Sequence, residues 1–190
     1  RPAARPRPAA RPRPPADVGR GPLDDSYWVG APNAAVDVVV FSDFQCPYSG
    51  RLADTLADLL ERYPQRVRVV FKHMPLPMHR DAHLAHQAAL AAGAQGRFWQ
   101  MHDLLFENQR QLGRAALEEY AVRIGLDLQR FRGALDSGQY ADRVERDMAL
   151  AKELGVRGTP TCFIDGRRLS GAQPIDRLVE QVERALAEGP

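Results

Sequence analysis

The sequence contains two cysteines, Cys46 and Cys162, in different settings. Cys46 stands in a polar turn, FSDFQCPYS at 41–49, that follows a run of apolar and β-branched residues and precedes a helical pattern. At the start of a helix, unpaired backbone N–H groups and the positive end of the helix dipole stabilise a thiolate. Because a thiolate attacks disulfides and forms mixed disulfides, this position predicts a nucleophilic cysteine. The alternative is an inert buried thiol.

The residues after Cys46 determine how such an exchange would end. Pro47 suits the first helical turn, where its missing N–H costs no hydrogen bond. Ser49 follows Cys46 by three residues, which along a helix brings its hydroxyl within reach of the sulfur as a donor. A serine cannot close a disulfide with Cys46, so the thiol that completes the exchange must come from outside. A second thiol of the substrate would give isomerisation, and a small external thiol would give reduction.

A Thr-Pro dipeptide, Thr159-Pro160, precedes the second cysteine. The pattern places the proline at the start of a strand, and Cys162, two residues later, points to the same face of that strand. Free cysteine is among the most buried residue types, so we interpret Cys162 as a small core residue. The alternative is a second thiol that resolves the mixed disulfide on Cys46, which requires the two Cα atoms to lie within about 7 Å.

The histidines and acids near Cys46 suggest supporting roles. His79, His83 and His86 have the spacing of one helical face, but Asp81 lies off that face and a zinc site needs a further strong ligand. We therefore predict no metal and no cofactor, with these histidines solvated or capping helix ends. Asp43 precedes Cys46 by three residues and is either a solvated turn acid or a modulator of the thiolate.

The elements that position these residues follow from hydrophobic periodicity and from Gly and Pro breaks. The pattern predicts a strand, a helix and a strand, then helical sequence throughout a central block, then two strands joined by an Asp-Gly turn, and a last helix. The predicted ranges are 36–41, 51–63, 67–71, 81–154, 161–164, 168–169 and the segment after Pro174. The resulting order is β-α-β, about five helices, then β-β-α, which indicates an α/β fold with a helical insertion.

Composition separates the N-terminal segment from the rest. The chain has 190 residues, of which 44% are hydrophobic and 26% charged, as in globular proteins. Residues 1–20 carry six arginines against one acid, whereas the remainder has 20 basic and 23 acidic residues. We interpret residues 1–22, rich in Arg, Pro and Ala, as an extended tether. The mildly acidic remainder argues against nucleic-acid binding, and no apolar run approaches the ~20 residues of a membrane span.

Four segments carry a resemblance to a known family. The turn FSDFQCPYS is similar to the active-site segment of DsbA-like thioredoxin-fold proteins, whose pattern is D-F-x-C-P-Y-C. Three further stretches resemble the same family: FKHMPLP at 71–77, RFWQMHDLL at 97–105 and GVRGTPTCFIDG at 155–166. The sequence departs from the family pattern at Ser49, which stands where the family has a second cysteine. Val40 stands where some DsbA-like proteins keep a buried acid.

The resemblance implies the domain organisation. A thioredoxin-like domain is expected at 23–78 and 155–190, with an all-helical insertion at 79–154. The family is bacterial, and together with the tether the resemblance implies an extracytoplasmic location, in the periplasm or cell envelope. The folded part is not expected to span a membrane, although the N-terminal tail is a candidate membrane tether.

The resemblance also implies the substrate-binding residues. Thr159-Pro160 corresponds to the family's cis-proline loop, which faces the catalytic cysteine and pairs through backbone groups with a substrate strand. Pro47 and Tyr48 are expected beside it. The expected partners are protein or peptide thiols and disulfides, and a small thiol such as glutathione.

Three classes of function remain open from the sequence. The first is thiol-disulfide exchange through a single nucleophilic Cys46, as an isomerase or reductase that uses an external resolving thiol. The second is a non-catalytic peptide-binding or chaperone-like module that retains the binding loop. The third is a glutathione-dependent transferase or isomerase on the same fold. The CPY and GTPT segments favour the first two.

Overall fold

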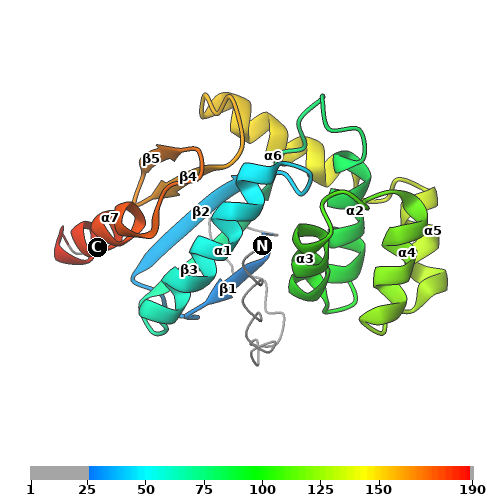
Figure 1. Ribbon diagram of the computed structural model, residues 1–190, viewed down its shortest axis with the longest axis horizontal. Coiled ribbons are helices and arrows are strands. Elements are labelled where there is room, and N and C mark those ends of the chain that lie inside the picture. The colour runs from blue at the N-terminus through cyan, green and yellow to red at the C-terminus, as the bar shows by residue number, and fades with distance from the viewer. Residues whose placement is uncertain (1–25, 189–190) are drawn as a thin grey trace, which may run out of the picture.

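A mixed five-stranded sheet lies at the centre of the computed structural model, which describes residues 26–188 (Figure 1). The strand order is β1-β3-β2-β4-β5, and only the pair β2–β3 is parallel. The strands are β1 Trp28–Gly30, β2 Val36–Ser42, β3 Val67–His73, β4 Thr161–Ile164 and β5 Arg167–Ser170. The predicted tether at 1–22 lies outside the described residues.

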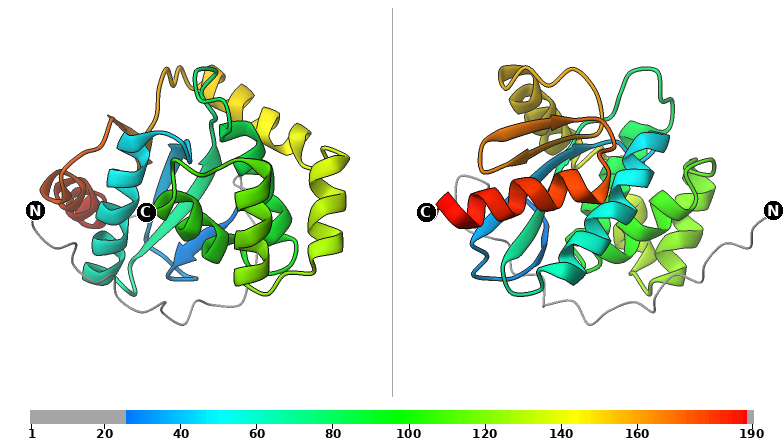
Figure 2. Two further views of the ribbon diagram at one scale, coloured as in Figure 1. Left: turned by 45° about the vertical axis from the view of Figure 1, so that its right-hand side comes forward. Right: turned by 60° about the vertical axis from the view of Figure 1, so that its left-hand side comes forward.

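Two helices cover one face of the sheet. They are α1, Pro47–Arg62, and α7, Ile175–Glu188, which lie side by side (Figure 1, Figure 2). Leu52, Leu56 and Leu59 form the buried stripe of α1, and each contributes about 1.5–3 kcal/mol by its burial. This stripe packs against the alternate β2 side chains that face the same side, so the start of α1 is held firmly against the sheet.

The helical block runs from β3 to β4 and lies to one side of the sheet (Figure 1). Its helices are α2 Ala82–Gly93, α3 Phe98–Glu107, α4 Arg114–Arg123, α5 Leu128–Asp136 and α6 Ala141–Glu153. The alanine-rich α2 is buried along almost its whole length, because small side chains let its neighbours approach closely. Gly93 permits one such approach, since a Cβ there would lie 2.3 Å from the Tyr27 ring.

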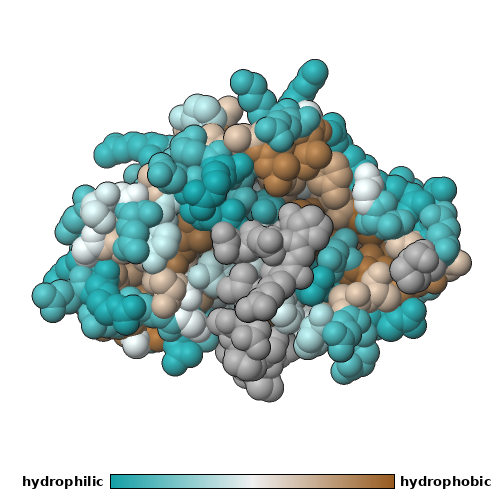
Figure 3. Space-filling model, turned by 180° about the vertical axis from the view of Figure 1, so that it is seen from behind, coloured by the Kyte–Doolittle hydropathy of each residue, from teal (hydrophilic) through white to brown (hydrophobic). Residues whose placement is uncertain are grey.

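The last helix of the block, α6, returns across the face opposite α1. Ala151 on α6 and Val156 after it pack with Phe41, whose side chain points away from α1. Seen from behind, the surface is largely hydrophilic, with smaller apolar areas between the polar side chains (Figure 3). Within residues 26–188, no helix is both long enough and apolar enough to cross a membrane.

The predicted fold class and element order are confirmed, with two differences. The sequence analysis missed β1, which has only three residues and pairs with β3 from the sheet edge. In addition, the apolar periodicity indicates the first helix only from residue 51, whereas α1 begins at Pro47, in agreement with the helix start expected after Cys46. Proline at the first helical position is compatible with this earlier start.

Candidate active site

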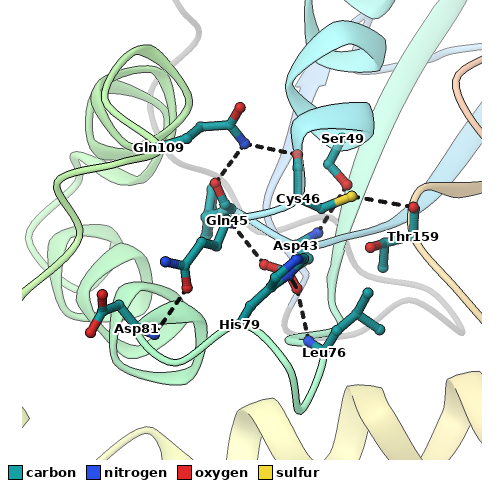
Figure 4. A network of polar contacts seen from close by, with 10 residues as sticks. Asp43, Gln45, Cys46, Ser49, Leu76, His79, Asp81, Gln109 and Thr159 are labelled. Atoms are coloured by element: carbon teal, nitrogen blue, oxygen red, sulfur yellow. Dashed lines mark hydrogen bonds and ion pairs between the residues drawn. The ribbon is translucent and has the colours of Figure 1, made fainter.

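Cys46 lies at the junction of β2 and α1, where it is the N-cap residue of α1 with φ −77° and ψ 121°. Its thiol lies 3.4 Å from the carbonyl oxygen of Thr159 and is oriented to donate a hydrogen bond to it (Figure 4). The Thr159-Pro160 peptide bond is cis. Cys46 is only 4% exposed, although it lies at the very start of the helix.

The sheet register explains how two segments 113 residues apart meet. The strands β2 and β4 are antiparallel neighbours, with Phe41 opposite Thr161. The residues directly after β2 and directly before β4 therefore lie at the same end of the sheet. This arrangement brings Cys46 and Thr159 together.

Asp43 is the centre of the polar contacts that hold the active-site turn. Its carboxylate is fully buried and accepts hydrogen bonds from the backbone N–H groups of Gln45 and Leu76, each at 2.8 Å. The same carboxylate lies 2.7 Å from Nδ1 of His79, and the Asp43 carbonyl accepts from the Cys46 N–H (Figure 4). Of the two roles open from the sequence, the solvated turn acid is wrong, because no part of this side chain reaches water.

Ser49 lies in the first turn of α1 and is 1% exposed. Its Oγ accepts a hydrogen bond from the Asp43 backbone N–H at 3.3 Å. The hydroxyl thereby ties the helix back to the turn through its oxygen. Its hydroxyl proton is still available for donation to an acceptor. The three-residue spacing along the helix places the Cys46 sulfur within reach as that acceptor.

Gln109 is a site residue that sequence analysis missed. It lies in the loop between α3 and α4, and its Nε2 donates to the carbonyl oxygens of Phe44 and Cys46, both at 2.8 Å. Gly50 makes room for it, because a Cβ there would lie 2.7 Å from the Gln109 side chain. A lone glutamine in a loop gives no sequence signal for a contact with a turn more than 60 residues away.

Pro47 and Tyr48 form an exposed rim on the outer side of the cysteine. Tyr48 is 54% exposed, and the Arg51 guanidinium lies 4.4 Å from the centre of its ring. An exposed aromatic ring next to a buried thiol offers apolar contact to a substrate chain. Of the other predicted binding residues, Thr159 meets the same thiol through its carbonyl oxygen, and Pro160 follows it across the cis bond.

Cys162 lies within β4, paired with Val40 of β2 and Leu169 of β5. Both cysteines are free thiols. Cys162 is 1% exposed and belongs to the hydrophobic core, and burial raises the pKa of its thiol to about 12. It therefore stays protonated at neutral pH, and a protonated thiol is a poor nucleophile. These surroundings favour the interpretation of Cys162 as a core residue.

The three histidines singled out from the sequence lie in three different environments. His79 pairs with Asp43, and His83 is half-buried beside Glu145 and Gln87. His86 is fully buried, with its Nδ1 2.7 Å from that of His73, so the expectation of a solvated or capping histidine is wrong for His86. Burial lowers the pKa of both His73 and His86 well below 6.5.

No group of three or more His, Cys, Asp or Glu side chains within the described part of the chain is arranged to hold a metal. The spacing of the three histidines predicted one face only if the helix began at residue 79, but α2 begins at Ala82.

Comparison with known proteins identifies the family. The model of the DSBA-like thioredoxin domain matches residues 37–183, which include both segments that meet at Cys46. The chain belongs to the DSBA-like thioredoxin domain family. Its fold is that of the DsbA-like thiol-disulfide oxidoreductases.

Solved structures of similar proteins share most of this fold. A thioredoxin-like oxidoreductase from Silicibacter pomeroyi is 27% identical in sequence, with a TM-score of 0.79. The match covers 90% of this chain and 96% of that protein. A periplasmic thioredoxin-like protein from Salmonella enterica serovar Typhimurium is 25% identical in sequence, with a TM-score of 0.71. This match covers 90% of this chain and 94% of that protein.

A protein of Salinispora tropica named Na(+)/H(+) antiporter NhaA 3 is 43% identical over 159 residues. These residues make up 83% of this chain but only 24% of the relative. The chain thus spans about a quarter of the length of the curated relatives it matches.

Proposed function

We propose that this protein catalyses thiol-disulfide exchange on protein or peptide substrates through Cys46 alone, with a resolving thiol supplied from outside. The observation that carries the proposal is the Cys46 thiol at the start of α1, in contact with the Thr159 carbonyl, with Ser49 in place of a second thiol. A substrate strand would pair with the backbone beside Thr159 while its disulfide meets the sulfur.

The reaction has two balanced steps. The Cys46 thiolate attacks one sulfur of a substrate disulfide, the substrate S–S bond breaks, and the other sulfur leaves as a thiolate that takes up a proton. A second thiolate then attacks the mixed disulfide and releases Cys46. If that thiolate belongs to the substrate, the disulfide is rearranged. If it belongs to a small thiol such as glutathione, a substrate–glutathione mixed disulfide forms, and a second glutathione thiolate then attacks that bond, which leaves the substrate reduced and releases glutathione disulfide.

The buried Cys162 does not substitute for the missing second thiol. Burial raises the pKa of the Cys162 thiol to about 12, so it stays protonated at neutral pH and is a poor attacking group. Because Ser49 has no thiol, Cys46 cannot form an intramolecular disulfide with it. We therefore do not expect the protein to donate a disulfide to its substrates. The proposed role is therefore that of an isomerase or reductase.

We further propose that the exchange takes place outside the cytoplasm and close to a membrane. The Salmonella protein of similar fold is described as periplasmic, and the Salinispora relative is named an antiporter. The Arg-, Pro- and Ala-rich residues 1–22 would connect the thioredoxin-like unit to its anchor or partner domain. An oxidising compartment would also supply disulfide substrates.

The test compares the parent protein with Cys46→Ala and Ser49→Cys. In a refolding assay on a protein with scrambled disulfides in a glutathione buffer, the parent should accelerate native pairing and Cys46→Ala should fall to the uncatalysed rate. Ser49→Cys should close a disulfide with Cys46 because position 49 already lies one helical turn away. It should gain dithiol oxidation that the parent lacks.

Two results would replace the proposal. If the parent binds an unfolded peptide but forms no mixed disulfide with it, the protein is a peptide-binding module. If it conjugates glutathione to a model electrophile and leaves disulfides unchanged, it is a glutathione-dependent enzyme on this fold. In a Ser49→Cys variant that forms the internal disulfide, failure to gain turnover would show that the surface around Cys46 does not bind disulfide substrates.

A further inference from the structure

A hollow of about 560 Å³ lies along the cis-proline loop, whose Thr159 contacts the Cys46 thiol. Its wall consists of the loop 155–161 together with Arg168, Ser170 and Gly171 at the end of the β4–β5 hairpin. Thr159 is shared between the hollow and the active site, because its carbonyl accepts the Cys46 thiol. A molecule whose sulfur reaches Cys46 along this loop would extend into the hollow.

The lining of the hollow is cationic. It contains two arginines, Arg157 and Arg168, and no acidic residue. The Arg168 guanidinium donates to the carbonyl oxygens of Leu154 and Gly155 at the end of α6, so its position is fixed by neutral acceptors that leave its charge uncompensated.

Arg157 is exposed and has no ion-pair partner among residues 26–188. It precedes Thr159 by two residues. Its charge therefore lies on the same loop whose carbonyl contacts the Cys46 thiol.

A hydroxyl group in the loop also lacks a hydrogen-bond partner. The Thr159 Oγ1 is buried and has no hydrogen-bond partner in the described part of the chain. A buried hydroxyl without a partner costs free energy, which a bound acceptor would recover. Two guanidinium groups and a free hydroxyl are the donors that a carboxylate prefers.

We propose that this hollow binds a carboxylate of the molecule that exchanges with Cys46, so that the preferred reactant is a disulfide or thiol with a carboxylate close to its sulfur. The inference rests on the exchange proposed above and specifies its reactant. Glutathione carries such carboxylates, and so does a peptide with Asp or Glu beside its cysteine. Arg157 is the main contributor to selectivity because its guanidinium is free to turn toward the ligand.

The experiment measures second-order rates of mixed-disulfide formation on Cys46 by mass spectrometry. The small reactants are glutathione disulfide and its ester, in which the carboxylates are masked. The peptide reactants are a disulfide-linked pair with Glu beside the cysteine and the same pair with Gln. The proteins are the parent, Arg157→Gln, Arg168→Gln and, as a matched loss of charge in the helical block, Arg123→Gln.

The parent should react faster with at least one carboxylate reactant than with its masked or Gln counterpart. Arg157→Gln should lose most of that preference, about tenfold for a charge-assisted hydrogen bond, with the ester and Gln rates unchanged. Arg123→Gln should keep the preference, and added salt should weaken it in the parent. A preference confined to glutathione disulfide or to the Glu peptide identifies the source of the carboxylate.

The outcomes separate this inference from the proposed function. Equal rates for carboxylate and masked reactants in the parent, or an equal loss of both in Arg157→Gln, would overturn the carboxylate site and leave exchange by Cys46 intact. Failure of Cys46 to react with any of the disulfides would overturn both. Arg168→Gln also removes contacts to α6, so a lowered melting temperature in that variant alone would reflect those contacts, and Arg157→Gln remains the deciding variant.

Discussion

Cys46 and Cys162 are almost equally buried, at 4% and 1% exposure, yet their surroundings give them opposite chemistry. Cys46 lies in a turn among backbone N–H and carbonyl groups, at the start of a helix. Cys162 lies in the middle of a sheet among apolar side chains, and burial raises its pKa to about 12. Exposure therefore does not distinguish the two thiols, whereas the groups that the fold provides around each sulfur do.

The difference depends on the support beneath each thiol. The turn that holds Cys46 is organised by one buried carboxylate, Asp43, whereas Cys162 is positioned by the strand register alone. Loss of a polar group should therefore destabilise the turn that holds Cys46. Gain of a polar group should destabilise the apolar surroundings of Cys162.

The largest stability effect is expected from Asp43→Ala. The substitution leaves the partly buried N–H groups of Gln45 and Leu76 and the ring of His79 without their acceptor, at a cost of roughly 3 kcal/mol. Asp58→Ala, on the exposed side of α1, is the control and should change stability by about 0.5 kcal/mol or less. Urea denaturation measures both. Equal stability of the two variants would show that Asp43 does not hold the turn.

A smaller loss is expected from Cys162→Ser. A hydroxyl placed in this apolar position has no polar partner in the core, so the substitution should lower the free energy of unfolding by about 1–3 kcal/mol. Exchange activity per folded molecule should stay at the parent level, because Cys46 and its loop are unchanged. Loss of exchange in a Cys162→Ser protein that is still folded would place Cys162 in the reaction and contradict the comparison.

The buried His73–His86 pair extends the comparison to pH. Both histidines have lowered pKa values in the fold, mainly because burial disfavours their charged forms. Unfolding lets them bind protons near pH 6.5, so their contribution to stability is complete above about pH 6.5 and is lost as the pH falls below it, by up to about 1.4 kcal/mol per pH unit for each histidine.

The variant His86→Gln tests this pH dependence, because it removes one titrating ring. Its free energy of unfolding, measured by denaturation from pH 7 to about 5, should fall less steeply than that of the parent. His83→Gln, one turn earlier on the same helix and only half-buried, should keep the parent slope. A parent stability that does not change over this range would contradict the neutral buried pair.

The sequence predicts those features that depend on local patterns. The order of elements follows from hydrophobic periodicity, and the placement of Cys46 at a helix start follows from a strand, a turn and a proline. The contacts of Asp43 could not be predicted in the same way. They join the turn after β2 to Leu76 and His79 beyond β3, and the chain gives no local signal for that pairing.

The histidines show the same limit. Their spacing is compatible with one helical face, but α2 begins at Ala82 and leaves His79 before the helix. The buried position of His86 depends on its packing against His73 at the end of β3. Gln109 likewise reaches the turn only because the helical block folds back onto α1. Tertiary packing determines these contacts, whereas local propensity determines the elements.

The most direct test of the central claim is alkylation of the native protein at neutral pH, with the labelled cysteine identified by peptide mass mapping. The structure predicts that iodoacetamide labels Cys46 first and labels Cys162 only after unfolding, because the Cys162 thiol stays protonated and lies within the core. Equal labelling of both cysteines in the folded protein, or labelling of Cys162 first, would contradict the assignment of Cys46 as the single reactive thiol.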